Sequence, residues 1–341
     1  MVSKRFVLKR LILLVPVLFG VGTFVFAILQ LAPGNPCRVI LGLRAEQSEI
    51  DRCVQNLGLD DPIWVQYGRF LADAAQFQFG DSYSVREGVP VRQILLNRLM
   101  VTLELAVIGQ FIGILFGIPL GVISAVKQDT IVDQLGRIGA LTGISVPIYW
   151  SGPLLILLFA TPPLSILPAS GRIGTFFEGT DYTSYTGLIL YDTLLSGNVE
   201  AFISAVQHLF LPTLVIGIYS MALISRMMRS SMLEVVRQDY IRTARAKGQG
   251  RKITLMKHGF RNALIPVVTV IGIQFGTLLG GAVLTETVFS INGMGKAIVA
   301  AISDSDFPVV QGTVLTFALL FTLVNLGVDI TYSYLDPRID Q

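Results

Sequence analysis

The sequence is poor in the residues from which soluble enzymes build their sites. Its 341 residues include only two cysteines and two histidines, and charged residues make up 14% of the chain. It contains no H-E-x-x-H motif and no G-x-x-x-x-G-K-[ST] phosphate-binding loop; the nearest segment, Gly293-Met294-Gly295-Lys296, lacks the earlier glycine. We therefore expect no catalytic residues, no cofactor and no metal bound by this chain.

Charged residues are also missing from six long apolar runs. Each run matches or exceeds the roughly 20 residues that an α-helix needs to cross the hydrocarbon core of a bilayer. The runs are residues 11–32, 105–126, 138–160, 205–225, 263–285 and 309–328. Hydrophobic residues make up 52% of the chain, and its mean hydropathy is +0.65. Uninterrupted runs favour helices over short alternating barrel strands, so we predict an all-α polytopic membrane protein with six transmembrane helices.

The first run follows four basic residues, as the core of a secretory signal would. It is longer than the usual core of about 7 to 15 residues, and the segment after it, Pro33-Gly34-Asn35-Pro36, is not a small-residue cleavage site. We expect a retained first span.

The distribution of Lys and Arg predicts the orientation, because these residues are held on the cytoplasmic side of a membrane. With the N-terminus inside, 17 of the 26 basic residues fall in cytoplasmic segments, and ten of these lie in residues 226–261 beside only two acids. We call residues 226–261 the basic loop. Residues 33–98 instead carry seven basic residues and eight acids. Both termini are then expected to be cytoplasmic.

Residues 33–98 predict a small external helical cap. Ser48 suits the N-cap of a first helix that Gly58 would close, and Asp61-Pro62 suits the start of a second helix. A further external stretch, residues 161–204, is expected to be mostly loop with a turn at 188–195.

Both cysteines, Cys37 and Cys53, fall in the external cap, where the compartment permits a disulfide. Two buried free thiols are the alternative. A metal site is not expected, because His208 and His258 would lie on opposite sides of the membrane and two thiols alone make a poor site.

Two spans carry a glycine at every fourth position, which lets helix backbones approach closely. These glycines are Gly109, Gly113, Gly117, Gly121, Gly272, Gly276 and Gly280. We expect them to pack helices within the chain; contact with a second subunit is the alternative. No charge lies at the centre of a span, which argues against a proton or ion relay. Gln274 is the only candidate for a polar pathway contact, unless it bonds to a neighbouring helix.

The basic loop predicts a short helix over 240–247, with Asp239 as its cap and Gly248 as its end, followed by a second basic helical stretch over 252–261. A helix with small residues and a glycine exit can seat in a groove of another protein. Attraction of the loop to anionic lipid is the alternative.

Specific residues of this loop, 239–248 (DYIRTARAKG) and 258–266 (HGFRNALIP), resemble the cytoplasmic loop of bacterial peptide permeases. These are membrane subunits of ABC importers in the dipeptide, oligopeptide and nickel group. Further similar segments are 33–36 (PGNP), 57–60 (LGLD), 66–67 (QY), 79–81 (FGD), 142–143 (TG), 168–172 (PASGR), 229–234 (RSSMLE), 284–289 (LTETVF) and 336–338 (DPR). The arrangement is most similar to the dipeptide-permease B-type subunit.

The resemblance implies the type I ABC importer permease fold, with residues 1–32 as the N-terminus and first span, 33–98 as the periplasmic cap and 99–341 as the core permease domain. Within the core, 226–262 would be the coupling loop that seats in an ATPase subunit. Its residues would be Asp239, Tyr240, Ile241, Arg242, Thr243, Ala244, Arg245, Ala246, Lys247 and Gly248. Arg242 and Thr243 depart from the family's general E-A-A pattern.

The resemblance also implies partners: a second homologous permease chain, two ATPase subunits that bind ATP and Mg, an extracytoplasmic solute-binding protein and membrane lipid, with no nucleic acid. The location would be the bacterial inner membrane and the cargo di- or oligopeptides. Alternatives are nickel, haem, opines or oligosaccharides as cargo, or a stand-alone secondary transporter.

Overall fold

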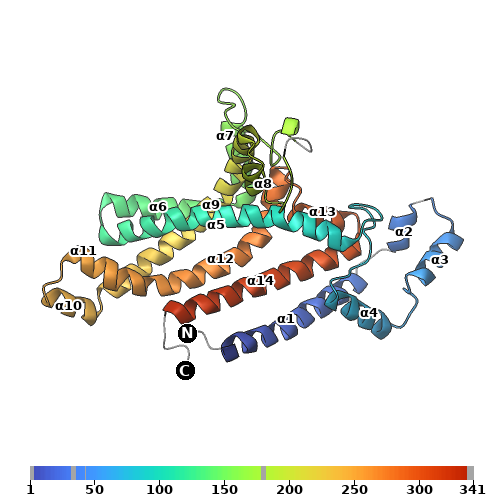
Figure 1. The fold of residues 1–341 in the computed structure, drawn as a ribbon, viewed down its shortest axis with the longest axis horizontal. Coiled ribbons are helices and arrows are strands. Elements are labelled where there is room, and N and C mark those ends of the chain that lie inside the picture. The colour runs from blue at the N-terminus through green and yellow to red at the C-terminus, as the bar shows by residue number, and fades with distance from the viewer. Residues whose placement is uncertain (1–3, 32–35, 43, 178–181, 336–341) are drawn as a thin grey trace.

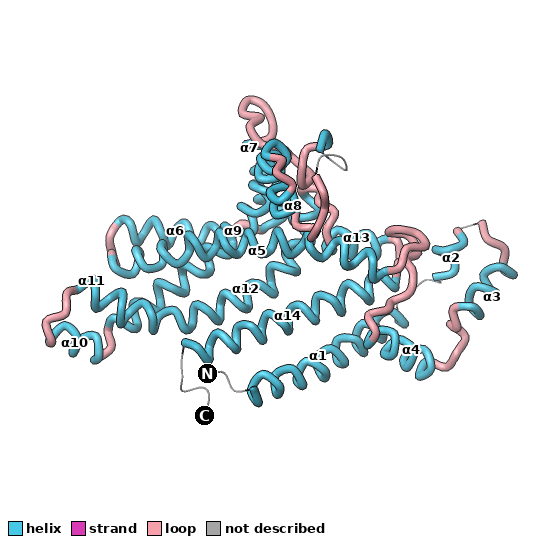
Figure 2. Tube along the Cα trace, viewed as in Figure 1, coloured by secondary structure: helices cyan, strands magenta, loops and turns pink. Residues whose placement is uncertain are grey.

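The protein is described by a computed structural model covering residues 4–31, 36–42, 44–177 and 182–335. In these ranges the regular secondary structure is helical, apart from one isolated bridge between Asp81 and Pro90 (Figures 1 and 2). The five longest helices are α1 (Lys4–Leu31), α5 (Val91–Val126), α9 (Val199–Val236), α12 (Arg261–Val288) and α14 (Phe307–Leu335). All five are long and apolar enough to cross a membrane, which confirms the predicted helical membrane fold.

The sixth expected span is not a single helix. Residues 131–159 form α6 (Ile131–Ser145) and α7 (Ile148–Phe159), which are bent by 105° relative to each other. The expected span over 138–160 is therefore broken, and it is the sixth span only if α6 and α7 are taken together. The break falls at Val146, whose backbone is extended (φ −79°, ψ 117°) because the residue before a proline, here Pro147, avoids the α conformation. In Figure 1, α7 leaves the direction of the bundle.

The glycine face of α5 packs against α9, as the sequence predicts. Gly109, Gly113, Gly117 and Gly121 lie against Ile216, Ser220, Ile224 and Met228 respectively. A Cβ atom at Gly121 would stand only 2.6 Å from the Cβ of Met228. Side chains at these positions would force the helices apart, so the glycines allow the close α5–α9 contact at the centre of the protein.

The remaining long helices form a layer beside this pair, in which α12 contacts α5, α9 and α14, and α14 contacts α1 (Figure 1). Gly272 and Gly276 face Val328 and Phe321 of α14, whereas Gly280 has no atom within 4 Å of its Cβ position. In α12, packing within the chain is thus confirmed for Gly272 and Gly276 but not for Gly280. Arg10 pairs with Asp329 at 3.1 Å, which joins the start of α1 to the last part of α14.

The cap contains α2 (Pro36–Leu41), α3 (Gln47–Asn56) and α4 (Ile63–Ala75), at the end of the bundle away from the basic loop (Figure 1). The prediction of Ser48 as the N-cap of α3 is wrong. The N-cap is Glu46, whose backbone N–H donates to the Glu49 carboxylate at 3.1 Å. Pro62 caps α4 in place of Asp61. Gly58 adopts the predicted left-handed conformation (φ +61°). The next helix, α5, already begins inside the range 33–98 assigned to the cap.

The second external stretch holds a 3-10 turn, η1 (Thr175–Phe177), and a short helix, α8 (Ile189–Leu195), where a turn was predicted. The expected loop ends earlier than residue 204, because α9 already begins at Val199 with the Asn198 side chain accepting the Ala201 N–H at 2.9 Å. Another short helix, α13 (Met294–Ser303), lies between α12 and α14.

Candidate functional site

The basic loop folds into a short helix, α10 (Asp239–Ala246), at one end of the bundle (Figure 1). Gln238, not Asp239, is its N-cap, because the first helical N–H groups, of Ile241 and Arg242, donate to the Gln238 carbonyl. The helix is therefore shifted by one residue from the predicted 240–247. An acid in its first turn and Arg245 in its last complement the helix dipole.

Gly248 ends α10 in the left-handed conformation, with φ +82°. Its N–H donates to the Arg245 carbonyl at 2.9 Å, and the Gln249 N–H donates to the Ala244 carbonyl at 3.2 Å, so the last carbonyls of the helix are satisfied. The Cβ position at Gly248 has no atom within 4 Å. The glycine is needed for its backbone conformation and leaves the exit of the helix open.

Most of α10 is presented to solvent. Ile241 is fully buried and Ala244 is half-buried, whereas the other side chains between 239 and 248 are exposed. The exposed face includes Arg242, at 78% exposure. One apolar anchor and an exposed basic face are what a helix needs to stay attached to its own chain while contacting another surface.

Two hydrogen bonds tie α10 and its exit to the start of α12. The Asn262 amide donates to the Tyr240 hydroxyl at 3.1 Å. The His258 ring pairs with the Gln249 side chain at 2.9 Å. A displacement of α10 would therefore be transmitted to α12 through side chains at the helix entry.

The predicted second basic helix over 252–261 is continuous with α12. It consists of α11 (Arg251–Ile253) and a π-helical segment, η2 (Thr254–Phe260), which runs directly into α12. Thr254, Leu255 and Gly259 are buried, and the Cβ position of Gly259 lies 3.9 Å from the Met232 side chain of α9. The basic loop thus contacts both long helices that it connects.

A buried ion pair, which the sequence analysis missed, joins α6 to α9 near this end. Arg229 donates to both carboxylate oxygens of Asp133, at 2.6 and 2.7 Å, and the Asp129 N–H donates to the same carboxylate at 3.0 Å. Ser124 of α5 also donates to Asp133. Asp133 is fully buried. The segment 229–234 pointed to Arg229, but nothing in the sequence identified a partner 96 residues away.

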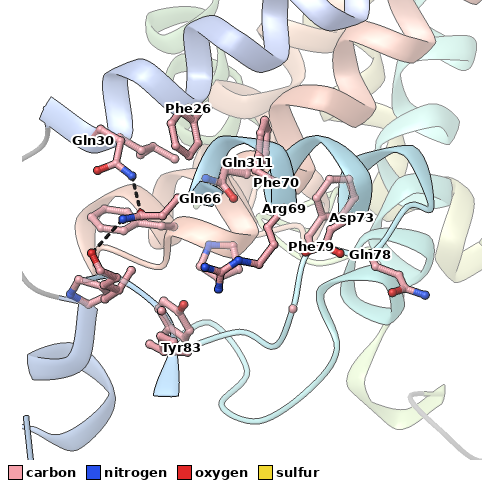
Figure 3. A pocket seen from close by; sticks show the side chains of 18 of the residues that line it. Phe26, Gln30, Gln66, Arg69, Phe70, Asp73, Gln78, Phe79, Tyr83 and Gln311 are labelled. Atoms are coloured by element: carbon pink, nitrogen blue, oxygen red, sulfur yellow. Dashed lines mark hydrogen bonds between the residues drawn. The ribbon is translucent and has the colours of Figure 1, made fainter. Parts of the chain in front are cut away.

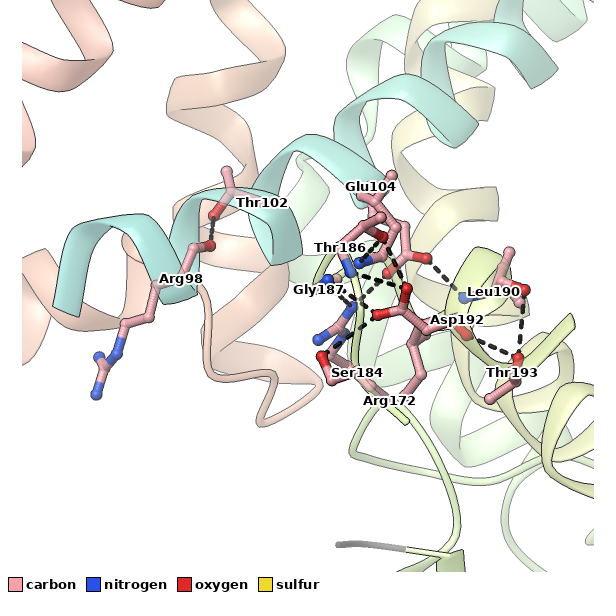
Figure 4. Close-up of polar contacts among 12 residues, drawn as sticks. Arg98, Thr102, Glu104, Arg172, Ser184, Thr186, Gly187, Leu190, Asp192 and Thr193 are labelled. Atoms are coloured by element: carbon pink, nitrogen blue, oxygen red, sulfur yellow. Dashed lines mark hydrogen bonds and ion pairs between the residues drawn. The ribbon is translucent and has the colours of Figure 1, made fainter. Parts of the chain in front are cut away.

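A second polar cluster fastens the stretch between α7 and α9 to α5 (Figure 4). Arg172 pairs with Glu104 and donates to the Gly187 carbonyl at 3.0 Å, while the Leu190 N–H donates to Glu104 at 3.0 Å. Asp192, itself fully buried, accepts hydrogen bonds from Ser184, Thr186 and Gly187.

These contacts determine the acidity of Asp192, which lies outside the long helices. Burial alone would raise the pKa of its carboxyl, but the hydrogen bonds from the Thr186 side chain and backbone, from the Gly187 backbone and from Ser184 outweigh burial. The pKa of Asp192 is consequently below its ordinary value. The carboxylate therefore stays charged and holds the 184–187 segment.

The remaining predicted site residues lie apart from the basic loop. Gln274 is 4% exposed within α12, and its amide nitrogen has no hydrogen-bond partner among the described residues. Cys37 and Cys53 are joined by a disulfide between α2 and α3, with their Cα atoms 5.8 Å apart. In the part of the chain that the structure describes, no cluster of three His, Cys, Asp or Glu side chains could hold a metal.

The long helices form a bundle that carries an exposed, anchored helix, α10, at one end and a folded cap at the other. This is the arrangement of a transport permease. The chain belongs to the family of inner-membrane components of binding-protein-dependent transport systems, whose model matches residues 117–341. A model of the N-terminal part of such membrane components matches residues 3–106. The protein is thus a non-catalytic, multi-pass membrane subunit of an ABC transporter, as the resemblance implied.

Individual relatives agree over almost the whole chain. The dipeptide transport system permease protein DppB of Alkalihalophilus pseudofirmus is 44% identical, and that of Escherichia coli is 43% identical; each alignment covers 98% of both chains. The glutathione transport system permease protein GsiC of Salmonella paratyphi A is 37% identical over 98% of both chains. Among solved structures, the MetNI methionine ABC transporter is similar with a TM-score of 0.50 and 16% identity, covering 72% of this chain and 97% of that chain. That likeness concerns the fold.

Proposed function

We propose that this chain is the permease subunit of an ATP-driven importer of short peptides, and that α10 couples its helices to a cytoplasmic ATPase. The substrate class is supported by the names of its relatives, which are dipeptide, di/tripeptide and glutathione permeases at 37–44% identity. The observation that carries the coupling role is the exposed face of α10, held by the buried Ile241 and by the Asn262–Tyr240 hydrogen bond to α12. The proposed coupling segment comprises all ten residues from Asp239 to Gly248, in which the buried Ile241 anchors the helix and the exposed residues face the ATPase.

In this proposal, ATP and Mg are bound by two partner ATPase subunits and not by this chain. A second, homologous permease chain completes the translocation pathway, and an extracytoplasmic binding protein delivers the peptide to the cap. The functional parts are residues 1–32, the cap 33–98 and the core 99–341, with the coupling loop at 226–262. Family membership supports ATPase and binding-protein partners in general.

The orientation that we propose puts both termini and the basic loop in the cytoplasm. The start of α1 and the last part of α14 lie together through the Arg10–Asp329 pair, on the side of the bundle away from the cap (Figure 1). The ten basic residues of the basic loop favour the cytoplasmic face. To test this orientation, a single cysteine is placed at residue 247 or at residue 60 of a chain that lacks Cys37 and Cys53. Intact cells are then treated with a membrane-impermeant thiol reagent. Labelling of position 247 in place of position 60 would reverse the orientation.

Gln274 is proposed as a pathway contact that becomes accessible when the helices separate. Its buried amide nitrogen without a partner, among the residues described, supports this role because such a group costs free energy unless another state satisfies it. Gln274→Leu should alter transport more than Thr277→Val, an exposed position one turn later on the same helix. Equal uptake by both variants would remove Gln274 from the pathway.

The decisive experiment is purification of this chain from solubilised membranes, with its partners identified by mass spectrometry and ATPase activity measured with and without dipeptide and binding protein. We expect P-loop ATPase subunits and a homologous permease chain to co-purify, with peptide-stimulated ATPase activity. A chain that purifies alone and transports in liposomes without ATP would overturn the proposal in favour of secondary transport. An intact complex stimulated by nickel or haem, and not by peptides, would overturn the substrate class alone.

A further inference from the structure

A cavity of about 520 Å³ lies in the cap, bounded by the last turns of α1, by α4 and by the start of α14 (Figure 3). We call it the cap cavity. Its volume falls in the range of about 300–1,000 Å³ that is typical of small-molecule sites. It lies at the cap ends of α1 and α14 and far from α10, so the proposed coupling role does not account for it.

One side of the cap cavity is aromatic. Phe26 of α1 and Phe70 of α4 pack against each other with ring centroids 5.6 Å apart, and Phe79 from the following loop also lines the space. These rings can receive an apolar side chain and exclude water around it. The aromatic side alone would suit many ligands, so the polar groups must decide the ligand class.

The first charged group is Arg69, which projects from α4 toward the cavity (Figure 3). One of its terminal nitrogens pairs with Asp61, and the other lies directly against Gly58, where a Cβ atom would overlap it. The guanidinium has five N–H donors and, among the described residues, a single carboxylate partner in Asp61, so donors remain for a second anion. Arg69 is 47% exposed and therefore accessible to a ligand.

The second charged group is Asp73, one turn later on the same face of α4 and also at the cavity. Among the described residues its carboxylate has no ion-pair partner. Positions i and i+4 of a helix hold their Cβ atoms about 5–6 Å apart. The cavity thus offers one positive and one negative side chain that leave the helix one turn apart.

Two opposite charges one helical turn apart suit a ligand that carries both charges close together. The charged ends of an extended dipeptide are at most about 7 Å apart, since each residue spans about 3.3–3.6 Å. A free amino acid carries its two charges on one carbon, and a longer peptide separates them beyond the reach of one helical turn. Neutral side chains, including Gln311 and Tyr83, complete the lining and can bond to the peptide unit.

We propose that the cap cavity binds zwitterionic dipeptides, with Arg69 holding the carboxylate, Asp73 holding the ammonium group and the Phe26–Phe70–Phe79 side receiving an apolar side chain. The proposal rests on the proposed peptide substrate class and adds a site on the permease itself. Such a site would retain a dipeptide near the external entrance after its release from the binding protein.

The test is equilibrium binding of tritiated Ala-Phe to the complete transporter in nanodiscs, without ATP and without binding protein. Two competitors remove one charge each: Ala-Phe amide lacks the carboxylate, and acetyl-Ala-Phe lacks the ammonium group. We expect Arg69→Gln to weaken Ala-Phe binding by about tenfold, equivalent to about 1.4 kcal/mol, while leaving the affinity of Ala-Phe amide unchanged. Asp73→Asn should weaken Ala-Phe similarly and leave acetyl-Ala-Phe unchanged.

Matched controls are Arg52→Gln and Asp51→Asn, which remove exposed charges of the same cap that do not line the cavity. Both should bind Ala-Phe like the unmodified transporter. Absence of Ala-Phe binding, wild-type affinity in Arg69→Gln and Asp73→Asn, or displacement only by lipid or detergent would each overturn the cavity proposal. Uptake of Ala-Phe with the binding protein is measured in parallel. If uptake persists in any of those cases, the cavity proposal fails while the proposed function stands.

Discussion

The basic-loop end and the cap end of the bundle differ in the number and placement of their charged residues. At the basic-loop end, ten basic residues accompany two acids, and α10 directs its charged side chains outward, with Arg242 78% and Asp239 98% exposed. The cap instead has seven basic residues and eight acids in residues 33–98, of which only Arg69 and Asp73 line its cavity, and it packs against α1 through the Phe26 and Tyr67 rings, 5.2 Å apart. One end therefore exposes its charges to solvent, whereas the other borders a cavity.

The two ends also differ in how they are fastened. α10 is held by one buried side chain and a few hydrogen bonds, while the cap is joined to α1 by the Thr23–Tyr67 hydroxyl pair at 2.6 Å and the Gln30–Gln66 amide pair at 2.9 Å. A lightly anchored helix can follow a partner that moves. A cap attached at several points keeps its internal spacing, which a binding site for a small ligand requires.

The largest effect is expected from a substitution that disrupts α10 and its exit alone. Gly248→Trp puts a bulky residue at φ +82°, which costs on the order of 1–3 kcal/mol locally, and blocks the open exit of α10. We expect uptake to be abolished while the chain still inserts and assembles its cap. Uptake of a radiolabelled dipeptide and membrane content by immunoblotting measure the two properties.

Gly250→Trp is the matched control, because Gly250 is also exposed with no atom within 4 Å of its Cβ position but has an ordinary φ of −59°. It should retain more uptake than Gly248→Trp. Unimpaired uptake by Gly248→Trp would refute the coupling role of α10.

The next effect concerns the buried pair that supports the basic-loop end. Removing one partner by Asp133→Asn or Arg229→Gln should lower the free energy of unfolding by about 3–5 kcal/mol, because the other charge stays buried without its bidentate partner. The double variant should lose less than the sum of the two. Thermal unfolding in detergent measures this.

An exposed pair of the same end provides the comparison. Asp239 and Arg242 are 3.9 Å apart and almost fully in solvent, so Asp239→Asn should leave the unfolding midpoint unchanged. Equal midpoints for Asp133→Asn and Asp239→Asn would contradict the importance of burial.

A smaller and localised effect is expected from opening the cap. Cys37 and Cys53 close a loop with a sequence separation of 16, and a bridge of this size stabilises by about 3 kcal/mol. Cys37→Ser with Cys53→Ser should lower the midpoint of cap unfolding, followed by hydrogen exchange over residues 47–75, and leave exchange of α10 unchanged. Maleimide labelling of both thiols in denatured, unreduced protein would show instead that the pair is not bridged.

Sequence reasoning located what depends on local pattern. Uncharged runs identified the long helices, a glycine at every fourth position identified the close-packing face of α5 but not its partner α9, and Gly248 identified the end of α10. It placed the N-caps of α3 and α10 one or two residues away from their positions. In α3, Glu46 and Glu49 form the cap in place of Ser48. In α10, the Gln238 carbonyl accepts the first helical hydrogen bonds, so Gln238 is the cap in place of Asp239.

What depends on distant partners was out of reach. Asp133 and Arg229 are 96 residues apart, and Glu104 and Arg172 are 68 apart, so no local pattern pairs them. The 105° bend between α6 and α7 has a local cause in Pro147. A proline in a transmembrane helix can also produce only a small kink that leaves the helix continuous. Only the surrounding packing decides between the two outcomes.

The smallest expected effect is a pH dependence of the segment around Asp192 that α10 should not share. The folded-state pKa of Asp192 is depressed, so its contribution to stability is present above the ordinary Asp value of about 3.9 and is lost as the pH falls through the lower folded value. Hydrogen exchange of residues 182–196, corrected for intrinsic rates, should therefore rise at pH values below about 3.9 and not above. In Asp192→Asn the segment should exchange faster at neutral pH and lose this dependence, because the amide accepts the bonds from Thr186 and Gly187 without a charge. α10, whose carboxylate is almost fully exposed, serves as the internal control. A parallel rise of exchange in both segments would mean that acid unfolds the protein globally, and that the Asp192 cluster is not the element that responds.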